Sequence, residues 1–171
     1  MSAVMKADKL RYREERGRVP RFQRLYRRTR AAKCKPIRLF YQILFHFSKK
    51  KRMIELSAAT EIGEGLYFGH PYCITVNRNA KIGRNCNIHK GVTIGQENRG
   101  KRKGTPTIGD QVWIGTGAVI VGKITIGSDV LIAPNAYVNC DVPDHSVVVG
   151  NPCVIHPKEN ATEGYICFQT N

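Results

Sequence analysis

The sequence lacks the features that define several common classes of protein. It has no apolar core near its start, so we expect no secretion signal and a cytoplasmic location. Its longest apolar stretch, residues 36–48, is too short to cross a bilayer. Its six cysteines include no Cys-x-x-Cys pair, which is typical of reduced thiols rather than of a disulfide framework or a zinc site.

Acidic residues are scarce in the first third of the chain. Residues 1–54 hold 18 Lys/Arg and 3 Asp/Glu, whereas residues 55–171 hold 10 of each. The net charge of +15 therefore belongs to the N-terminal segment, which predicts contact with something anionic. No recognition motif for nucleic acid accompanies the charge, so a membrane surface is the favoured partner and nucleic acid is not expected.

We interpret residues 1–53 as a basic N-terminal arm. Residues 1–35 are polar and rich in arginine, and we expect some helix in them but no packed domain. Residues 36–48 are apolar and aromatic, have basic flanks, and are predicted to form a helix. Two compatible roles stay open for this helix: it caps the end of the next domain, or it lies at the inner membrane surface.

An apolar residue recurs at every sixth position between residues 56 and 142, with two interruptions. This period fits neither an amphipathic helix nor a single alternating strand. It fits short strands joined by tight corners, with the apolar residue pointing inward and a glycine often following it. The recurring residues are Leu56, Ile62, Phe68, Val76, Ile82, Ile88, Ile94, Ile108, Ile114, Ile120, Ile126, Ile132 and Val138.

The two interruptions of this repeat mark candidate sites. Between Phe68 and Val76 the step is eight residues, and the extra residues fall beside His70. Between Ile94 and Ile108 the step is fourteen, so residues 96–106 leave the coil as a loop rich in Gly and Lys/Arg. A solenoid tolerates insertions at its corners, and such insertions often form the binding face.

The repeated pattern of a branched apolar residue, Gly, two variable residues and a small residue resembles the hexapeptide signature of acyltransferases. The resemblance implies a mainly β fold, a left-handed parallel β-helix over residues 54–156, followed by a tail over residues 157–171. It also implies a homotrimer. The stretch from Glu55 to His70, with Val92-Thr93-Ile94-Gly95 and Gly150-Asn151-Pro152, is similar to the serine acetyltransferase branch.

This resemblance implies roles for two residues in catalysis. His70 takes the position of the catalytic histidine, and Glu55 falls where the branch has an acidic residue that orients the imidazole. A hydroxyl is a poor nucleophile until a base removes its proton, and an imidazole suits that task near neutral pH. A carboxylate on the other ring nitrogen would fix the tautomer. We therefore expect direct transfer of acetyl from acetyl-CoA to a hydroxyl, without an acyl-enzyme.

The same resemblance implies residues that bind substrates. Acetyl-CoA is expected in a groove between subunits, and no metal is expected. The positions that match the family's cofactor site are Gly95, Gln96, Gly115, Thr116, Ala133, Pro134 and Lys158. The candidates for contact with the acceptor are Tyr67, His89 and Thr105.

Three departures from the branch bear on the acceptor. The histidine and arginine that help to bind serine are replaced by Thr105 and Gly104, and the acidic residue before the catalytic histidine is Gly69. The chain is more similar to short O-acetyltransferases of surface polysaccharides. We therefore expect a sugar hydroxyl as acceptor, on a lipid-linked precursor at the inner membrane, with L-serine as the alternative.

Two other classes of function stay open. The γ-class carbonic anhydrases use this fold and bind zinc through three histidines, two of them five residues apart, whereas the regular repeats here, residues 56–142, hold only His70 and His89. A non-catalytic scaffold would bind no coenzyme A and would be insensitive to changes at His70.

Overall fold

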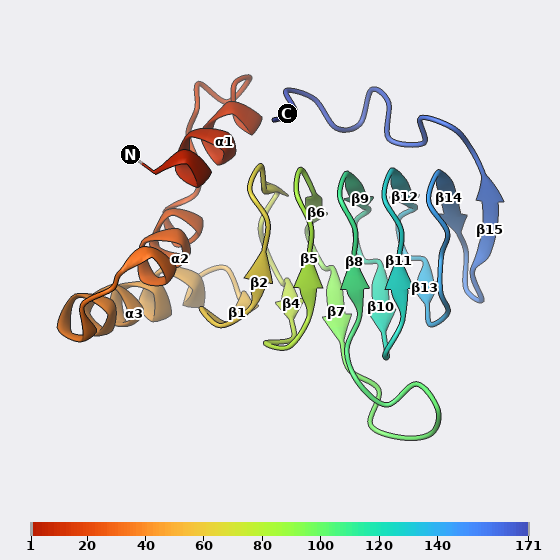
Figure 1. Cartoon of the computed structure of the whole chain (residues 1–171), viewed down its shortest axis with the longest axis horizontal. Helices are drawn as coiled ribbons and strands as arrows, with labels where there is room; N and C mark the ends of the chain where they lie inside the picture. Colours follow the sequence, from red (N-terminus) through yellow and green to blue (C-terminus); the bar gives the residue numbers. More distant parts are fainter. Residues whose placement is uncertain (1, 171) are drawn as a thin grey trace.

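The computed structural model describes residues 2–170 and shows three helices followed by a triangular stack of parallel strands. The helices are α1 (Ala3–Arg11), α2 (Arg21–Ala31) and α3 (Lys35–Lys50). They lie at the end of the stack where the first coil begins (Figure 1). The chain after the last strand runs back along the stack, so the C-terminal end lies beside α1 (Figure 1).

The stack has three faces, each a sheet whose strands come from successive coils. Face A contains β1 (Glu55–Leu56), β4 (Thr75–Val76), β7 (Thr93–Gly95), β10 (Val119–Val121) and β13 (Tyr137–Val138). Face B contains β2 (Glu61–Ile62), β5 (Lys81–Ile82), β8 (Thr107–Ile108) and β11 (Thr125–Ile126). Face C contains β3 (Tyr67–Gly69), β6 (Asn87–His89), β9 (Val112–Ile114), β12 (Val130–Ile132), β14 (Ser146–Val149) and β15 (Val154–Pro157).

The recurring apolar residues fill the interior of this β-helix, as the repeat predicts. On face C, for example, Ile88 pairs in register with Ile114, and Ile114 pairs with Ile132. All three side chains are 0% exposed. Burial of each such side chain contributes about 1.5–3 kcal/mol, so the ladder of inward residues holds successive coils together. The predicted parallel β-helix of hexapeptide repeats is confirmed.

The insertions fall where the sequence predicts them. Along face A, the register partners are Glu55 with Thr75, Thr75 with Thr93, Thr93 with Val119 and Val119 with Tyr137. Successive coils therefore advance by 20, 18, 26 and 18 residues. The 20-residue coil contains His70, and the 26-residue coil contains the 96–106 loop, which projects from one edge of the stack between β7 and β8 (Figure 1).

The first half of the arm differs from the expected unpacked segment. Tyr12, Phe22 and Tyr26 are at most 1% exposed and pack on the first coils. Asp8 is 0% exposed and accepts hydrogen bonds from both Nε and Nη2 of Arg27, at 2.8 and 3.0 Å. The arm folds because its charged side chains pair with one another and with coil carbonyls, which composition alone does not reveal.

Helix α3 packs on α2 with one side and leaves its other side in solvent. Five large apolar side chains on it are between 49% and 62% exposed: Ile37, Leu39, Phe40, Ile43 and Phe47. Within residues 2–170, no helix is long and apolar enough to cross a membrane. Contact of α3 with a membrane surface stays a prediction. Equal sedimentation of the wild type and Phe40→Ser with anionic vesicles would contradict it.

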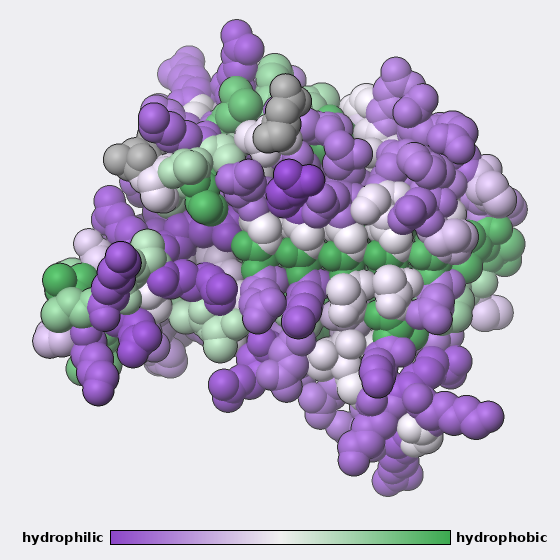
Figure 2. All heavy atoms as spheres, in the orientation of Figure 1, coloured by the Kyte–Doolittle hydropathy of each residue, from purple (hydrophilic) through white to green (hydrophobic). Residues whose placement is uncertain are grey.

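The tail after β15 is fastened along face C. The Asp129 carboxylate accepts hydrogen bonds from the backbone N–H groups of Ala161 and Thr162, at 2.9 and 3.0 Å. Burial raises the pKa of Asp129, but hydrogen bonds from Thr162 and His145 outweigh it and leave the pKa below its usual value. Further along, Asn85 bonds to Thr170. The tail thus covers the outer side of face C. On the projecting 96–106 loop, hydrophilic side chains dominate (Figure 2).

Candidate active site

The candidate base, His70, lies at the corner that joins face C to face A, directly after β3. Its backbone is left-handed, with φ of +50°, and its side chain is exposed. Non-glycine residues in this conformation cluster at functional sites, although histidine tolerates it better than most. The two-residue insertion therefore holds an imidazole in solvent at a corner of the stack.

Glu55 begins face A at the same corner, one coil earlier. Its backbone N–H donates to the carbonyl oxygen of Ile74 at 2.8 Å, and Ile74 is four residues after His70. In the part of the chain that the structure describes, no hydrogen bond joins the Glu55 carboxylate to His70. The Glu55 carboxylate acts on Lys49: burial lowers the pKa of Lys49, and the charge of Glu55 raises it in part. The orienting role of Glu55 stays a prediction.

Four of the predicted cofactor residues form a column below His70 on the same corner. Gly117 N–H donates to Lys90 O at 3.0 Å, and Asn135 N–H donates to Thr116 O at 2.9 Å, so these turns stack coil upon coil. A Cβ at position 115 would lie 2.6 Å from Pro134 N, which leaves only glycine there. The four residues of the column are Gly115, Thr116, Ala133 and Pro134.

The remaining cofactor candidates lie elsewhere in a single chain. Gly95 and Gln96 end face A at its far edge, where Gln96 accepts a hydrogen bond from Asn77 at 3.2 Å. Lys158 follows β15, and its N–H donates to His145 O at 2.7 Å. Lys158 is thus separated from the column by the length of the four-residue strand β14, about 13 Å. One chain does not gather all seven residues.

The three acceptor candidates are also dispersed. Thr105 Oγ1 donates to Asn79 O at 3.1 Å at the root of the 96–106 loop. Tyr67 is covered by the arm, and its hydroxyl donates to Glu15 Oε1 at 2.7 Å. His89 lies next to the His70 corner, because it pairs in register with Gly69. Burial lowers the pKa of His89, and the charge of His70 contributes to the lowering.

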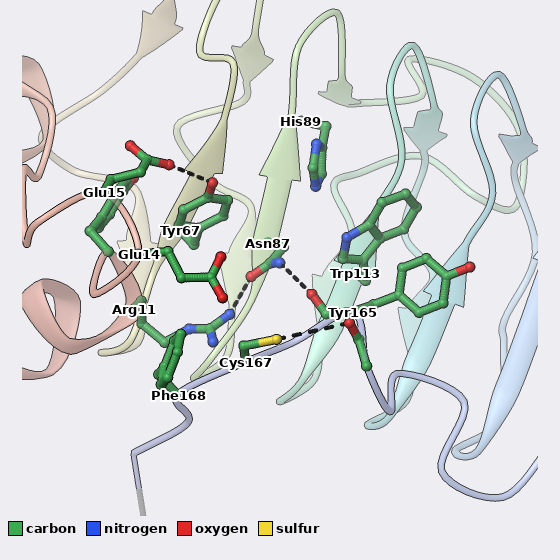
Figure 3. Close-up of a pocket in the computed structure, with 12 residues that line it drawn as sticks. Arg11, Glu14, Glu15, Tyr67, Asn87, His89, Trp113, Tyr165, Cys167 and Phe168 are labelled. Carbon is green, nitrogen blue, oxygen red and sulfur yellow. Dashed lines mark hydrogen bonds between the residues drawn. The ribbon is translucent and has the colours of Figure 1, made fainter.

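His89 explains why position 69 is a glycine. A Cβ at Gly69 would lie 2.4 Å from His89 Nδ1, so the acidic residue of the serine acetyltransferase pattern does not fit above this ring. On its other side the ring contacts Trp113 in a tilted arrangement, with centroids 4.7 Å apart and an interplanar angle of 49°. The His89 side chain points away from the interior of the β-helix and lines a cavity together with residues of the arm and the tail (Figure 3).

A cavity of about 260 Å³ lies beside His89, between face C, the arm and the tail. Sequence reasoning missed most of its walls, including Arg11, Glu14 and Trp113. The polar, arginine-rich sequence of residues 1–35 predicts no packed domain, so it does not indicate that Arg11 and Glu14 line a cavity. One residue did indicate that this face is covered. Trp113, the only tryptophan in the sequence, occupies an outward position of a strand, and a large aromatic side chain is unfavourable on a face fully open to solvent. Within residues 2–170, no group of three or more His, Cys, Asp or Glu side chains is arranged to hold a metal ion.

The fold and the corner histidine define the chain as an acyltransferase of the hexapeptide-repeat class. A family model described as bacterial transferase hexapeptide (six repeats) matches residues 105–140. The serine acetyltransferase of Helicobacter pylori is 37% identical over 117 residues, which cover 67% of this chain and 68% of that protein. The chain belongs to the serine acetyltransferase family.

Solved structures agree with this family. The soybean serine acetyltransferase apoenzyme has a TM-score of 0.75 and 28% identity, covering 90% of this chain and 68% of that one. The soybean enzyme complexed with serine gives a TM-score of 0.75 and 27% identity, with the same coverage. The match extends beyond the coils, because 90% of the chain includes part of the helical arm.

The predicted sugar acceptor of a surface polysaccharide is therefore wrong, and the lipid-linked partner is withdrawn with it. The related proteins are named serine acetyltransferases. The prediction depended on Gly104 and Thr105 in the 96–106 loop, on Gly69, and on the similarity to short polysaccharide O-acetyltransferases. Loops vary among relatives more readily than the coils that carry the histidine, so two loop residues do not define the acceptor.

Proposed function

We propose that this protein is a serine O-acetyltransferase that uses acetyl-CoA. The observation that carries the proposal is the 37% identity with the H. pylori serine acetyltransferase over two thirds of both chains. The structural support is a histidine at a corner insertion, on the same corner as a column of small residues.

The proposed reaction is a direct displacement at the thioester carbonyl. His70 removes the proton from the serine hydroxyl as its oxygen attacks, giving a tetrahedral intermediate. The intermediate collapses with cleavage of the C–S bond, and the imidazolium returns its proton to the departing thiolate. The products are O-acetylserine and free coenzyme A. Glu55 would orient the imidazole once the substrates are bound.

The predicted cofactor residues lie apart in one chain, which supports a site shared between copies of the chain. We propose that acetyl-CoA lies along the column of Gly115, Thr116, Ala133 and Pro134, and that a neighbouring copy in a homotrimer supplies Gln96 or Lys158. A groove completed by a second copy accounts for residues that one chain holds apart. Sedimentation equilibrium at the mass of a single chain, with and without coenzyme A, would contradict this assembly.

The test of the function is release of the coenzyme A thiol from acetyl-CoA. We expect release that depends on L-serine and saturates with it, with formation of O-acetylserine detected by mass spectrometry. A hexose and a nucleotide-linked sugar at the same concentrations serve as control acceptors. Release that requires a sugar and ignores L-serine would overturn the proposal.

A further inference from the structure

Two cysteines that are 13 residues apart in the sequence lie in contact near the C-terminal end of the β-helix. Cys140 follows β13, the last strand of face A, and Cys153 ends the turn between β14 and β15. These three strands lie together at that end of the stack (Figure 1). The two Sγ atoms are 3.8 Å apart, within hydrogen-bond distance for sulfur. The two thiol groups therefore point toward each other.

The Cys140–Cys153 pair differs from the other cysteines of the chain. Cys86 is 1% exposed, and burial raises the pKa of its thiol to about 12, so this thiol is not expected to react. Cys140 and Cys153 are partly exposed, so a small oxidant can reach them. Within residues 2–170, the three fully exposed thiols contact no second sulfur; they are Cys34, Cys73 and Cys167.

The contact between the two sulfurs needs only a small movement to become a covalent bond. A disulfide is about 2.05 Å long, so the Sγ atoms, now 3.8 Å apart, need to approach by about 1.7 Å. Rotation about the two Cα–Cβ bonds can supply this movement. The turn that carries Cys153 is itself fixed to β13, because Tyr137 N–H donates to Gly150 O at 3.0 Å. The backbone thus holds the two cysteines side by side.

The pair lies where the β-helix has the fewest neighbours. The terminal coil of a solenoid contacts another coil on one side only. Face A ends at β13, whereas face C continues to β14 and is closed by β15, which pairs antiparallel with β14. A bond between the two sulfurs would fasten the β14–β15 turn to the end of face A. It would also enclose residues 140–153 in a covalent ring, which restricts the unfolded chain.

The groups around Cys140 determine how readily its thiolate forms. Burial raises the pKa of the Cys140 thiol, and the hydrogen bond and charge of Cys153 raise it further. The charge of Asp141 also raises this pKa, whereas Arg102 of the 96–106 loop lowers it. The thiolate is the form that attacks an oxidant. Because the thiol is mostly protonated near neutral pH, its oxidation should become faster as the pH rises.

We infer that Cys140 and Cys153 are a modification site, at which a peroxide forms a reversible disulfide that fastens the last coil. One thiolate attacks an oxygen of the peroxide, and the O–O bond breaks, giving a sulfenic acid and a hydroxide that takes up the proton lost by the thiol. The second thiolate attacks the sulfenic sulfur, and the hydroxide that leaves is protonated in the same way. Both sulfurs are oxidised, and hydrogen peroxide is reduced to two water molecules. A dithiol reverses the bond by exchange. The modification does not depend on the proposed function.

Peptide mapping of the full-length protein tests the pair directly. The sequence has no Lys or Arg between Lys123 and Lys158, so trypsin releases residues 124–158 as one peptide that contains Cys140, Cys153 and no other cysteine. After treatment with hydrogen peroxide and alkylation with iodoacetamide in denaturant, we expect this peptide to have lost two hydrogen atoms and to carry no alkyl group. Dithiothreitol before alkylation should restore both alkylation sites.

Three results of the mapping would overturn the inference. They are two alkylated cysteines after peroxide treatment, oxidation to sulfinic acid in place of a bond, and a cross-link from either residue to a different cysteine. None of them requires a variant, so a substitution that fails to fold does not obscure the outcome.

Thermal unfolding measures the effect of the bond on the last coil. A ring of this size should raise Tm by about 5–10 °C in peroxide-treated wild type, relative to the same protein reduced with dithiothreitol. Cys140→Ser and Cys153→Ser should each abolish this rise. Cys34→Ser is the matched control, because Cys34 is exposed just before α3, and it should keep the rise. An unchanged Tm with the disulfide present would show that the bond does not fasten the last coil.

Discussion

Replacing His70 with Asn should reduce kcat for serine acetylation by about 10²–10⁴-fold, the usual contribution of a general base. Asn is the informative substitution because it tolerates the left-handed backbone at this position, where φ is +50°. The imidazole is exposed, so the thermal unfolding midpoint should change little. The measurement is thiol release at saturating serine and acetyl-CoA, with the melting curve recorded on the same sample.

His156→Asn provides the control for the His70 variant. His156 is an exposed histidine on β15, at the far end of the stack from β3. It should retain full activity. A His70→Asn enzyme with kcat within about threefold of wild type would remove His70 from the mechanism and leave His89 as the next candidate.

Replacing Asp8 with Ala should lower the free energy of unfolding by about 3–5 kcal/mol, because it leaves the guanidinium of Arg27 buried without a counter-ion. The Asp8 carboxylate is 0% exposed and also accepts from Gln23 Nε2 at 3.0 Å and from Leu66 N–H at 3.1 Å. These donors come from α2 and from the first coil. The carboxylate therefore joins the arm to the β-helix.

Urea unfolding measures this effect, with two comparisons. Glu61→Ala removes a carboxylate from an exposed pair with Lys81 at 4.0 Å and should cost less than about 1 kcal/mol. Asp8→Ala combined with Arg27→Met should recover part of the loss, because the unpaired charge is removed as well. A cost for Asp8→Ala no larger than that of Glu61→Ala would show that the buried pair does not fasten the arm.

The coils were predictable from the sequence, and the arm was not. The burial of residues such as Ile88 and Ile114 can be predicted from the fixed period of the repeat, because each coil has the same local geometry. The contacts of the arm have no period: Tyr12 meets Phe68, and Asp8 meets Leu66, across more than fifty residues. Buried charges are rare, so an arginine-rich segment favours the interpretation of a solvated one.

The candidate site also has a part that the sequence predicts and a part that it does not. His70 could be selected because an insertion breaks the repeat at its position, whereas Gly115 and Pro134 were expected only from the resemblance to the family. The cavity could not be predicted, since it exists only where the arm and the tail meet face C. Arg11 and Tyr165 are distant in sequence and become neighbours only through Asn87, which bonds to both.

The return of the tail to α1 has a consequence for how the protein is made. The ribosome synthesises about 5–20 residues per second. The arm and the coils up to β14 therefore emerge well before residues 161–170, which fasten to Asp129 and Asn85. Until those residues appear, face C is bare and the cavity has only two of its walls. The nascent chain can hold a nearly complete β-helix and still lack a finished cavity, so this cavity is completed last during synthesis.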